Sequence, residues 1–391
     1  MDVLVTGGGV AGAAAAIALR RIGADVTIHE AYADPAGQVG SFLSLASNGL
    51  RALRALGCLD EVAAAGFPVP HQRMWSGSGK LLGAGPRGRL DSDPLHSVTL
   101  MRAELVRVLR EEAVRAGVRI VTDHRLVGAE AVGGAVRAEF TDGSQHTADL
   151  LVGADGLRSA TRSALDPTAP SPRYAGFFTV SGVTESAAVE GVPTEPGCFN
   201  MVFARHGAFL HLPAPDGTLW WSAQVADPRP PDLEGFTGDE GVTKLAGVYR
   251  DDPVPYEIVR AAAALHRPTP MHTLAEVPRV HTDRMVLIGD AAHPVGAGQG
   301  ASMAVEDAVV LAQCLAGEPS TQAALAGYER RRRSRVARMA RAATANRDAK
   351  APGPVRRRVR DLVMPYVFRH AQARATAWLY KYDIGALPER G

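Results

Sequence analysis

The apolar and polar residues at the amino terminus predict a strand, a helix and a second strand. Residues 3–6 are apolar enough for a short buried strand, and residues 26–30 are spaced as another. Between them, residues 13–21 have the small and apolar composition of a buried helix. A glycine-rich turn at residues 7–12 joins the first strand to this helix. The order predicts the first β-α-β unit of a parallel sheet.

Beyond this unit the pattern changes character. Residues 66–98 are rich in Pro, Gly and Ser, and residues 171–277 consist mostly of short alternating segments, which predicts a mainly antiparallel sheet. Apolar runs typical of buried parallel strands return at residues 150–153 and 285–288. A long helix is expected over residues 301–315, and the remainder of the chain has a helical, basic pattern.

These segments predict an α/β fold: a Rossmann-like domain with an inserted, mainly antiparallel β-sheet domain and C-terminal helices. The Rossmann-like domain is expected to be discontinuous, because its strands lie on both sides of the inserted sheet. The expected boundaries are 1–65, 99–168 and 278–345 for the Rossmann-like domain, 66–98 and 169–277 for the sheet domain, and 346–391 for the helical segment.

The turn at residues 7–12 has the spacing G-x-G-x-x-G. Gly7 allows the tight turn, Gly9 lets the backbone approach a pyrophosphate, and Gly12 lets the helix pack against the strand. The helix that follows directs free amide groups and a partial positive charge at the phosphates. A glycine-rich turn without a ligand is the alternative, but the flanking strands and helix favour a dinucleotide site. The expected cofactor contacts here are Gly7, Gly9, Val10, Ala11 and Gly12.

Glu30 ends the second predicted strand, at the spacing from the glycines where dinucleotide-binding folds place an acid. A carboxylate there accepts hydrogen bonds from ribose hydroxyls and repels a 2′-phosphate. The bound nucleotide is therefore expected to carry an ADP-ribose without that phosphate.

Length and composition narrow the class of protein. The 391 residues, 46% of them hydrophobic and 21% charged, suit a globular protein of two closely packed domains. A net charge of +2 is too balanced to favour nucleic acid or an anionic membrane as the main partner. A strand expected from residue 2 leaves no room for a signal peptide, and no apolar run is long enough to cross a bilayer. A cytoplasmic location is expected.

No motif for a metal or a catalytic nucleophile is present in the sequence. Cys58, Cys198 and Cys314 are far apart and match no disulfide or metal pattern, so buried reduced thiols are expected. There is no H-E-x-x-H, no CxxC and no signature of a Ser/His/Asp triad.

A second motif follows the strand at residues 285–288, in the sequence GDAAHP with a later GQG and ED. A strand that ends in Gly289-Asp290 can direct one carboxylate at the ribityl hydroxyls of a flavin. The helix after Gly300 would direct its amino terminus at the N1–C2=O region of the ring, which favours reduction. Taken alone, Asp290 would be more typical of a helix cap or a turn, and His293 more typical of a structural polar residue. The run as a unit favours a flavin site.

With these motifs the chain resembles the class A flavoprotein monooxygenases, the p-hydroxybenzoate hydroxylase-like enzymes, and among them the shorter, salicylate hydroxylase-like branch. The resemblance spans residues 1–345 and also rests on the segment LVGADGLRS at residues 151–159. It implies that Asp290 contacts the ribityl chain of FAD. It further implies that Asp155 and Gly156 take part in FAD and NAD(P)H binding, and that Arg102 lies near the FAD phosphates. The expected contacts in the last motif are Gly289, Asp290, Gly298, Gly300 and Ala301.

The resemblance also implies a reaction in which the cofactor carries the chemistry. NADPH or NADH reduces FAD, O2 gives a C4a-hydroperoxyflavin, and one oxygen atom passes to an aromatic or other electron-rich small molecule, by hydroxylation or epoxidation. Two alternatives remain open. One is a flavin-dependent oxidoreductase that does not oxygenate, and the other is a flavin-binding protein without turnover.

The sequence offers fewer candidate catalytic residues than cofactor contacts. His211 lies mid-strand on the same face as Phe209, where it could deprotonate a phenol or be a structural histidine. The resemblance places His293 and Pro294 at the flavin edge that faces substrate, with His293 expected to support the loop. The sheet residues that could line a pocket or belong to the core are Tyr174, Phe177, Phe203, Trp221 and Gln224.

The basic run at residues 330–333, continued by Arg335, Arg338 and Arg341, is expected to form a solvated helix face with salt bridges, with no nucleic-acid partner. Residues 355–382 are expected to pack over the domain junction or against a partner subunit, so the protein is expected to be a monomer or homodimer.

Overall fold

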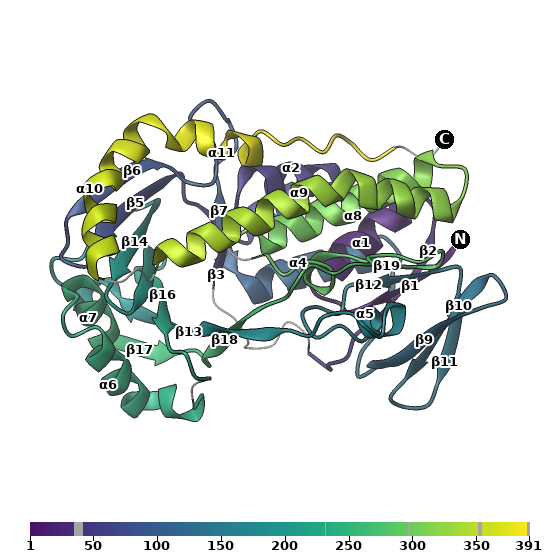
Figure 1. Cartoon of the computed structure of the whole chain (residues 1–391), viewed down its shortest axis with the longest axis horizontal. Helices are drawn as coiled ribbons and strands as arrows, with labels where there is room; N and C mark the ends of the chain where they lie inside the picture. The colour runs from purple at the N-terminus through teal and green to yellow at the C-terminus, as the bar shows by residue number, and fades with distance from the viewer. Residues whose placement is uncertain (35–41, 231, 296–297, 351–353, 389–391) are drawn as a thin grey trace.

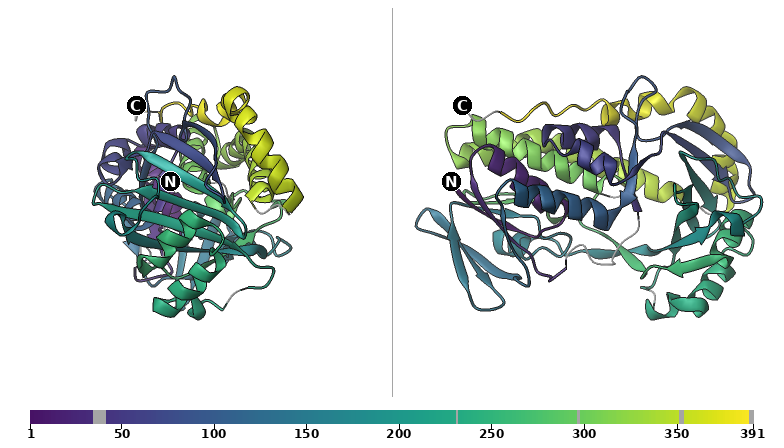
Figure 2. Two further views of the ribbon diagram at one scale, coloured as in Figure 1. Left: turned by 90° about the vertical axis from the view of Figure 1, so that its left-hand side faces the viewer. Right: turned by 180° about the vertical axis from the view of Figure 1, so that it is seen from behind.

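The computed structural model describes residues 1–34, 42–230, 232–295, 298–350 and 354–388. Figure 1 shows an elongated molecule with a large antiparallel sheet at one end and a small β-meander at the other, and Figure 2 shows the same arrangement from two further sides. The long helix α9 (Thr321–Lys350) runs along the molecule and joins the two ends.

A parallel sheet forms the centre of the amino-terminal part, with the strand order β19-β12-β1-β2-β8. Val3 and Val5 face one hydrophobic cluster and Leu4 faces another, because side chains alternate along a strand and both faces of this sheet are buried. The bounds are β1 Asp2–Thr6, β2 Asp25–His29, β8 Arg119–Val121, β12 Leu150–Gly153 and β19 Met285–Leu287.

Helices cover one face of this sheet and the meander covers the other. Small residues on the first helix let it pack closely against the eighth, which follows the second motif. The helices on that side are α1 Val10–Arg21, α2 Ser47–Ala55, α3 Leu59–Ala64, α4 Arg102–Arg115 and α8 Gly300–Gly317. The opposite side has β9 Leu126–Val132, β10 Ala135–Phe140, β11 Gln145–Ala148 and α5 Ala160–Leu165.

An eight-stranded sheet forms the second part, in the order β17-β13-β16-β15-β14-β5-β6, with β18 also paired to β13. Its pairs are antiparallel except that β14 runs parallel to β5, which brings residues 71–86 into one sheet with residues 173–273. The bounds are β5 His71–Ser76, β6 Leu81–Pro86, β13 Arg173–Glu185, β14 Cys198–Ala204, β15 Gly207–Pro213, β16 Thr218–Ala226, β17 Ala262–Leu265 and β18 Thr269–Thr273.

Residues 171–277 form mostly strands, as expected, but they also contain two helices that the sequence pattern did not indicate, α6 (Gly238–Val248) and α7 (Pro253–Arg260), on the outer face of this sheet. They cover a core of Phe209, Trp221 and Tyr249. Three short segments, β3 (Phe42–Leu45), β4 (Phe67–Pro68) and β7 (Val98–Met101), connect the two parts.

After α9, the helices α10 (Pro354–His370) and α11 (Gln372–Tyr380) turn back over the molecule. α10 packs against the large sheet and α11 against α8 and α9, so the carboxyl-terminal segment contacts both parts. The predicted α/β fold class is confirmed, and the three cysteines are buried and free. Within the described ranges no helix is both long and apolar enough to pass through a membrane.

Candidate cofactor and substrate site

The glycine turn between β1 and α1 has the geometry of a phosphate site. Gly7 has a φ of +94°, and a Cβ there would lie 2.5 Å from the carbonyl oxygen of Ala154. A Cβ on Gly12 would lie 1.8 Å from the carbonyl oxygen of Gly7, so both positions require glycine. Gly9 instead faces open space, with no atom within 4 Å of where a Cβ would be. Since α1 has no side-chain cap, its first amides are available to a phosphate at this opening.

Glu30 is buried beside this turn and its orientation is fixed by two backbone amides. Its Oε2 accepts a hydrogen bond of 2.6 Å from the amide of Gly8, and its Oε1 accepts one of 3.0 Å from the amide of Tyr32. Each oxygen keeps a second lone pair, so the carboxylate can still accept hydrogen bonds from ribose hydroxyls. That role stays a prediction.

The second motif packs directly against the first. Gly289 has a φ of +57°, and a Cβ there would lie 2.8 Å from the Cβ of Ala11 at the start of α1. Residues Gly289–Ala291 form a short 3-10 helix after β19. The fold therefore brings together two turns that are almost three hundred residues apart in the sequence.

Asp290 carries a carboxylate without a hydrogen-bond partner in the described part of the chain. Its side chain is exposed to solvent, but the protein atoms around it still desolvate the carboxylate in part. This desolvation raises the pKa of Asp290, although the nearby charges of His293 and Arg102 oppose the rise. Arg102 opens α4, is exposed, and forms no ion pair with the described residues. An unpaired carboxylate beside an unpaired guanidinium fits a ligand that has both hydroxyl and phosphate groups.

Two glycines border the same region. Gly298 has a φ of +72° and faces open space, and a Cβ on Gly300 would lie 3.8 Å from Oδ1 of Asp290. Gly300 and Ala301 open α8, so the amino terminus of this helix lies next to the Asp290 carboxylate. The glycine turn, Glu30, Asp290 and the start of α8 together fit an extended flavin dinucleotide.

Asp155 is engaged within its own turn. Its Oδ2 accepts hydrogen bonds from the amide and the hydroxyl of Thr161, at 2.9 and 3.0 Å, and Ser159 donates to its Oδ1. The carboxylate therefore fixes the turn between β12 and α5, a role that the motif did not indicate. Gly156 has a φ of +75° and faces open space, so direct cofactor contact stays a prediction for its backbone.

A buried network of charged residues on α8 and α9 holds the loop that contains Gly289 and Asp290, which we call the Gly-Asp loop. Oδ2 of Asp307 accepts hydrogen bonds from the amide of Gly289 at 2.8 Å and from Nε2 of His293 at 2.7 Å. Nε of Arg332 donates to Oδ1 of Asp307 at 2.6 Å, and its Nη1 donates to Glu306 at 2.7 Å. Arg335 also donates to Glu306, at 2.6 Å.

Charge neutralisation sets the protonation of this network. Burial alone would raise the pKa of Asp307, but His293 and Arg332 lower it to about 2. Burial alone would lower the pKa of His293, but the Asp307 carboxylate raises it above its ordinary value. His293 therefore keeps its proton, donates a hydrogen bond to the ionised Asp307 carboxylate and supports the loop.

The network corrects the expectation for the basic run. Arg332 is 2% exposed and Arg335 is 7% exposed, because both point from α9 into α8. Their partners Glu306 and Asp307 are adjacent acids in the middle of an apolar helix, and this is the signal that could have predicted a buried ion pair. Arg333, by contrast, is exposed as expected.

His211 does not reach a cavity, which corrects its assignment as a candidate base. It is fully buried on the face of the large sheet that α6 and α7 cover, in register with Trp221 and beside Phe209. Neither ring nitrogen has a hydrogen-bond partner in the described chain, and burial lowers the pKa of His211 to about 3. Phe203 also lies outside the cavity, under α10.

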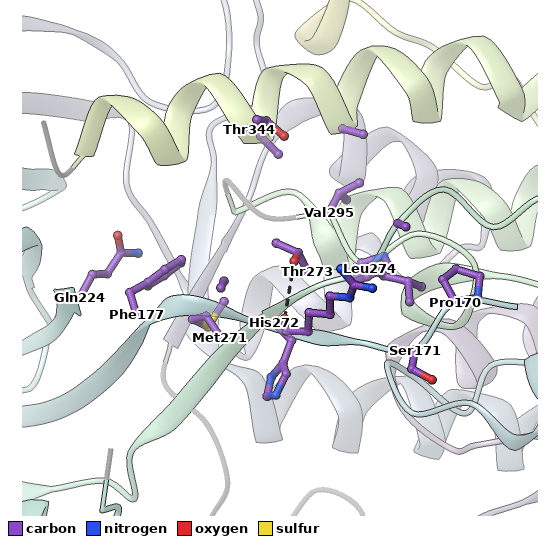
Figure 3. A pocket seen from close by; sticks show the side chains of 16 residues that line it. Pro170, Ser171, Phe177, Gln224, Met271, His272, Thr273, Leu274, Val295 and Thr344 are labelled. Atoms are coloured by element: carbon purple, nitrogen blue, oxygen red, sulfur yellow. Dashed lines mark hydrogen bonds between the residues drawn. The ribbon is translucent and has the colours of Figure 1, made fainter. Parts of the chain in front are cut away.

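A cavity of about 820 Å³ lies between the large sheet and α9, with the loop at Pro294 and Val295 as one wall (Figure 3). Gln224 and Phe177 point into it from the inner face of the sheet, and Thr344 closes it from α9. Among the residues that the structure describes, its polar lining comprises Ser171, Arg173, Gln224, His272, Thr273 and Thr344 and includes no carboxylate. The sequence pattern did not indicate that Arg173, His272 or the α9 residues would line a cavity.

Pro294 thus separates the turn that contains Asp290 from the cavity. A second cavity of about 430 Å³ shares Pro294, Val295 and Ala340 with the first and continues along α9. Volumes in this range suit a small organic ligand. The arrangement places a ligand-sized, largely apolar space next to the proposed flavin contacts.

Comparison with known proteins shows the family and the fold to which the chain belongs. The model of a family described as "FAD binding domain" matches residues 1–343. Aurachin C monooxygenase/isomerase of Stigmatella aurantiaca is 33% identical over 347 residues, which cover 84% of each chain. Kynurenine 3-monooxygenase of Salinispora arenicola is 33% identical over 366 residues, which cover 88% of this chain and 79% of that protein. The structure of Klebsiella pneumoniae HpxO with FAD and uric acid shares the fold, with a TM-score of 0.82, 24% identity and coverage of 97% and 96%.

Proposed function

This chain belongs to the FAD binding domain family, and from that premise we propose that it is an FAD-dependent monooxygenase. It uses NADPH or NADH and O2 to hydroxylate or epoxidise an aromatic or similarly electron-rich small molecule. The observation that carries the proposal is the carboxylate of Asp290, which has no hydrogen-bond partner among the described residues. It belongs to the loop whose Gly289 packs against Ala11 of the first turn and whose Pro294 lines the cavity.

The cofactor contacts follow from the groups that face the opening. The amides at the start of α1 bind the pyrophosphate, Glu30 binds the ribose, and Asp290 binds the ribityl hydroxyls with Arg102 nearby. The amino terminus of α8 favours negative charge on the flavin ring. Bound FAD supplies the electron transfer and the activation of O2.

The chain itself binds and orients the substrate. Apolar walls from Phe177, Val295 and Met271 exclude water from the cavity, and the Gln224 amide can hydrogen-bond a ring substituent. Arg173 is the only formal charge in the described lining, so a phenol bound near it ionises more readily and becomes more electron-rich. We assign no general base to the chain, because His211 lies on the far side of the sheet.

Isotope labelling tests the function. The FAD-loaded protein is supplied with NADPH or NADH, a panel of aromatic compounds and heavy-isotope O2, and the products are analysed by mass spectrometry. We expect nicotinamide oxidation that an aromatic compound accelerates, with one labelled oxygen atom in the product. Nicotinamide oxidation that gives only hydrogen peroxide with every compound would favour a reductase. If neither NADPH nor NADH reduces the flavin, the result would favour a flavin-binding protein without turnover.

A further inference from the structure

Helix α10 is apolar on two opposite faces, and only one of them is covered. On the inner face, Met364 and Phe368 pack against Met74, Leu82 and Phe203 of the large sheet. The Phe368 ring lies so close to Gly83 that a Cβ there would be 2.3 Å from it. This packing fixes the helix on the outside of the sheet, at the end of the molecule (Figures 1 and 2).

The opposite face presents large apolar side chains to solvent. Leu362 is 75% exposed and Tyr366 is 69% exposed. Their positions, three or four residues apart, align them along one side of the helix. We call this surface the outer stripe, and it consists of Val359, Leu362, Val363, Tyr366 and Val367. A helix that is apolar on both faces is normally covered on both, and a contiguous exposed patch of this kind marks a docking surface.

The charges beside the outer stripe indicate what covers it. Arg358 and Arg369 flank the stripe on α10, and Arg374 follows on α11. All three are exposed, and none forms an ion pair with the residues that the structure describes. The one acid on α10, Asp361, is paired with Arg360. The net charge of +2 for the whole chain therefore conceals a local excess of positive charge around the stripe.

These charges favour an anionic surface over a second copy of the chain. A two-fold interface through the stripe would bring the same arginines of both copies to one rim, where they repel. A bilayer with anionic headgroups offers the opposite charge around an apolar interior. Basic amphipathic helices bind such surfaces with the apolar residues in the headgroup–acyl boundary and the arginines at the phosphates.

We propose that the outer stripe docks on an anionic lipid surface and holds the protein there as a peripheral membrane protein. α10 lies in the plane of the membrane interface, with Leu362 and Tyr366 inserted. The inner face stays packed on the large sheet, so docking needs no unfolding. This proposal does not depend on the oxygenation chemistry.

Co-sedimentation of the FAD-loaded protein with lipid vesicles tests the proposal. We expect binding to vesicles of phosphatidylcholine and phosphatidylglycerol, weak binding to phosphatidylcholine alone, and loss of binding in high salt. Leu362→Glu should lower the partition coefficient about tenfold or more, because it removes a leucine that the bilayer would bury and adds a charge that the anionic headgroups repel. Val114→Glu is the matched control, because Val114 is 57% exposed on α4, away from the stripe, and should leave partitioning unchanged.

A second variant separates the charge from the apolar contact. Replacing Arg358, Arg369 and Arg374 with Gln should weaken binding to anionic vesicles about a hundredfold and leave binding to neutral vesicles unchanged. Absence of binding to either vesicle would overturn the proposal. So would a wild-type dimer that Leu362→Glu converts to a monomer while neither form binds lipid, because the stripe would then be a subunit interface. Retained FAD and an unchanged far-ultraviolet spectrum establish that each variant is folded.

Discussion

At the residue scale, Asp290 is the side chain on which cofactor binding depends most. Asp290→Ala removes a charged acceptor for the ribityl hydroxyls, which should weaken FAD binding by about 1.5–3 kcal/mol, or roughly tenfold to a hundredfold in Kd. Fluorescence titration of the apoprotein with FAD measures this change. Asp283→Ala, an exposed acid in the turn before β19, is the control and should bind FAD like the wild type. Equal affinity in the two variants would show that Asp290 does not contact the cofactor.

For His211 we predict an effect on folding stability and no effect on activity. Its pKa falls from 6.5 to about 3 in the folded chain, so below about pH 6.5 only the unfolded chain gains this proton. Folding stability is therefore lost as the pH falls from 6.5 toward 3, at up to about 1.4 kcal/mol per pH unit. His211→Phe should make the free energy of unfolding fall less steeply over this range, as measured with urea. The pH profile of kcat should not change, and a shifted profile would restore His211 as a base.

Local motifs predicted the two glycine turns because tight turns depend on short-range spacing, and the flavin contacts at these turns stay a prediction. Gly7 and Gly289 each have a positive φ, which is a local requirement of the turn, whereas the close approach of Ala154 to Gly7 and of Ala11 to Gly289 comes from the fold. The orientation of His211 could not be predicted in this way. Period-two alternation places it on the same face as Phe209, but it does not say which face borders the cavity.

At the element scale, the contact between α8 and α9 holds the Gly-Asp loop through Asp307. Asp307→Asn leaves His293 buried without its counter-charge and leaves Arg332 with Glu306 alone, which should cost about 3 kcal/mol of folding free energy. Urea unfolding followed by tryptophan fluorescence measures the loss. Glu111→Gln breaks an exposed ion pair with Arg107 on α4 and should cost less than about 1 kcal/mol. Similar losses in the two variants would mean that the network does not hold the loop.

Helices and strands with strong periodicity were predicted well, and weakly patterned ones were missed. The helix expected at residues 301–315 is observed as Gly300–Gly317. Helix α6 was missed because it begins with Gly238 and contains Gly241 and Thr243, which have low helix propensity. Packing against the large sheet stabilises it instead. The burial of Arg332 was also missed, because its acidic partners lie on another helix.

At the scale of the whole molecule, FAD should stabilise the chain as a unit, because its proposed contacts come from the start of α1, the residue after β2, the start of α4, the loop at Asp290 and the start of α8. At a free concentration one hundred times Kd, FAD should add about 2.7 kcal/mol to the free energy of unfolding and raise Tm. Differential scanning calorimetry measures the shift. Riboflavin lacks the pyrophosphate and adenosine contacts and should shift Tm much less. Equal shifts for FAD and riboflavin would argue against the glycine turn as a phosphate site.

The overall arrangement was predictable only in outline. The parallel and antiparallel sheets follow from their patterns, but the parallel pairing of β14 with β5 joins segments that are more than a hundred residues apart. The exposure of the outer stripe of α10 could not be predicted either, because apolar residues on both faces of a helix do not show which face the rest of the protein covers.

The central claim is that one FAD lies between the start of α1 and Asp290, with its ring toward the cavity at Pro294. A crystal structure of the protein with FAD tests it most directly. We expect the pyrophosphate at Gly9 and the amides of α1, the ribityl chain at Asp290, and the ring beside the amino terminus of α8. A crystal grown with saturating FAD that shows the dinucleotide elsewhere, or none at this turn, would contradict the account.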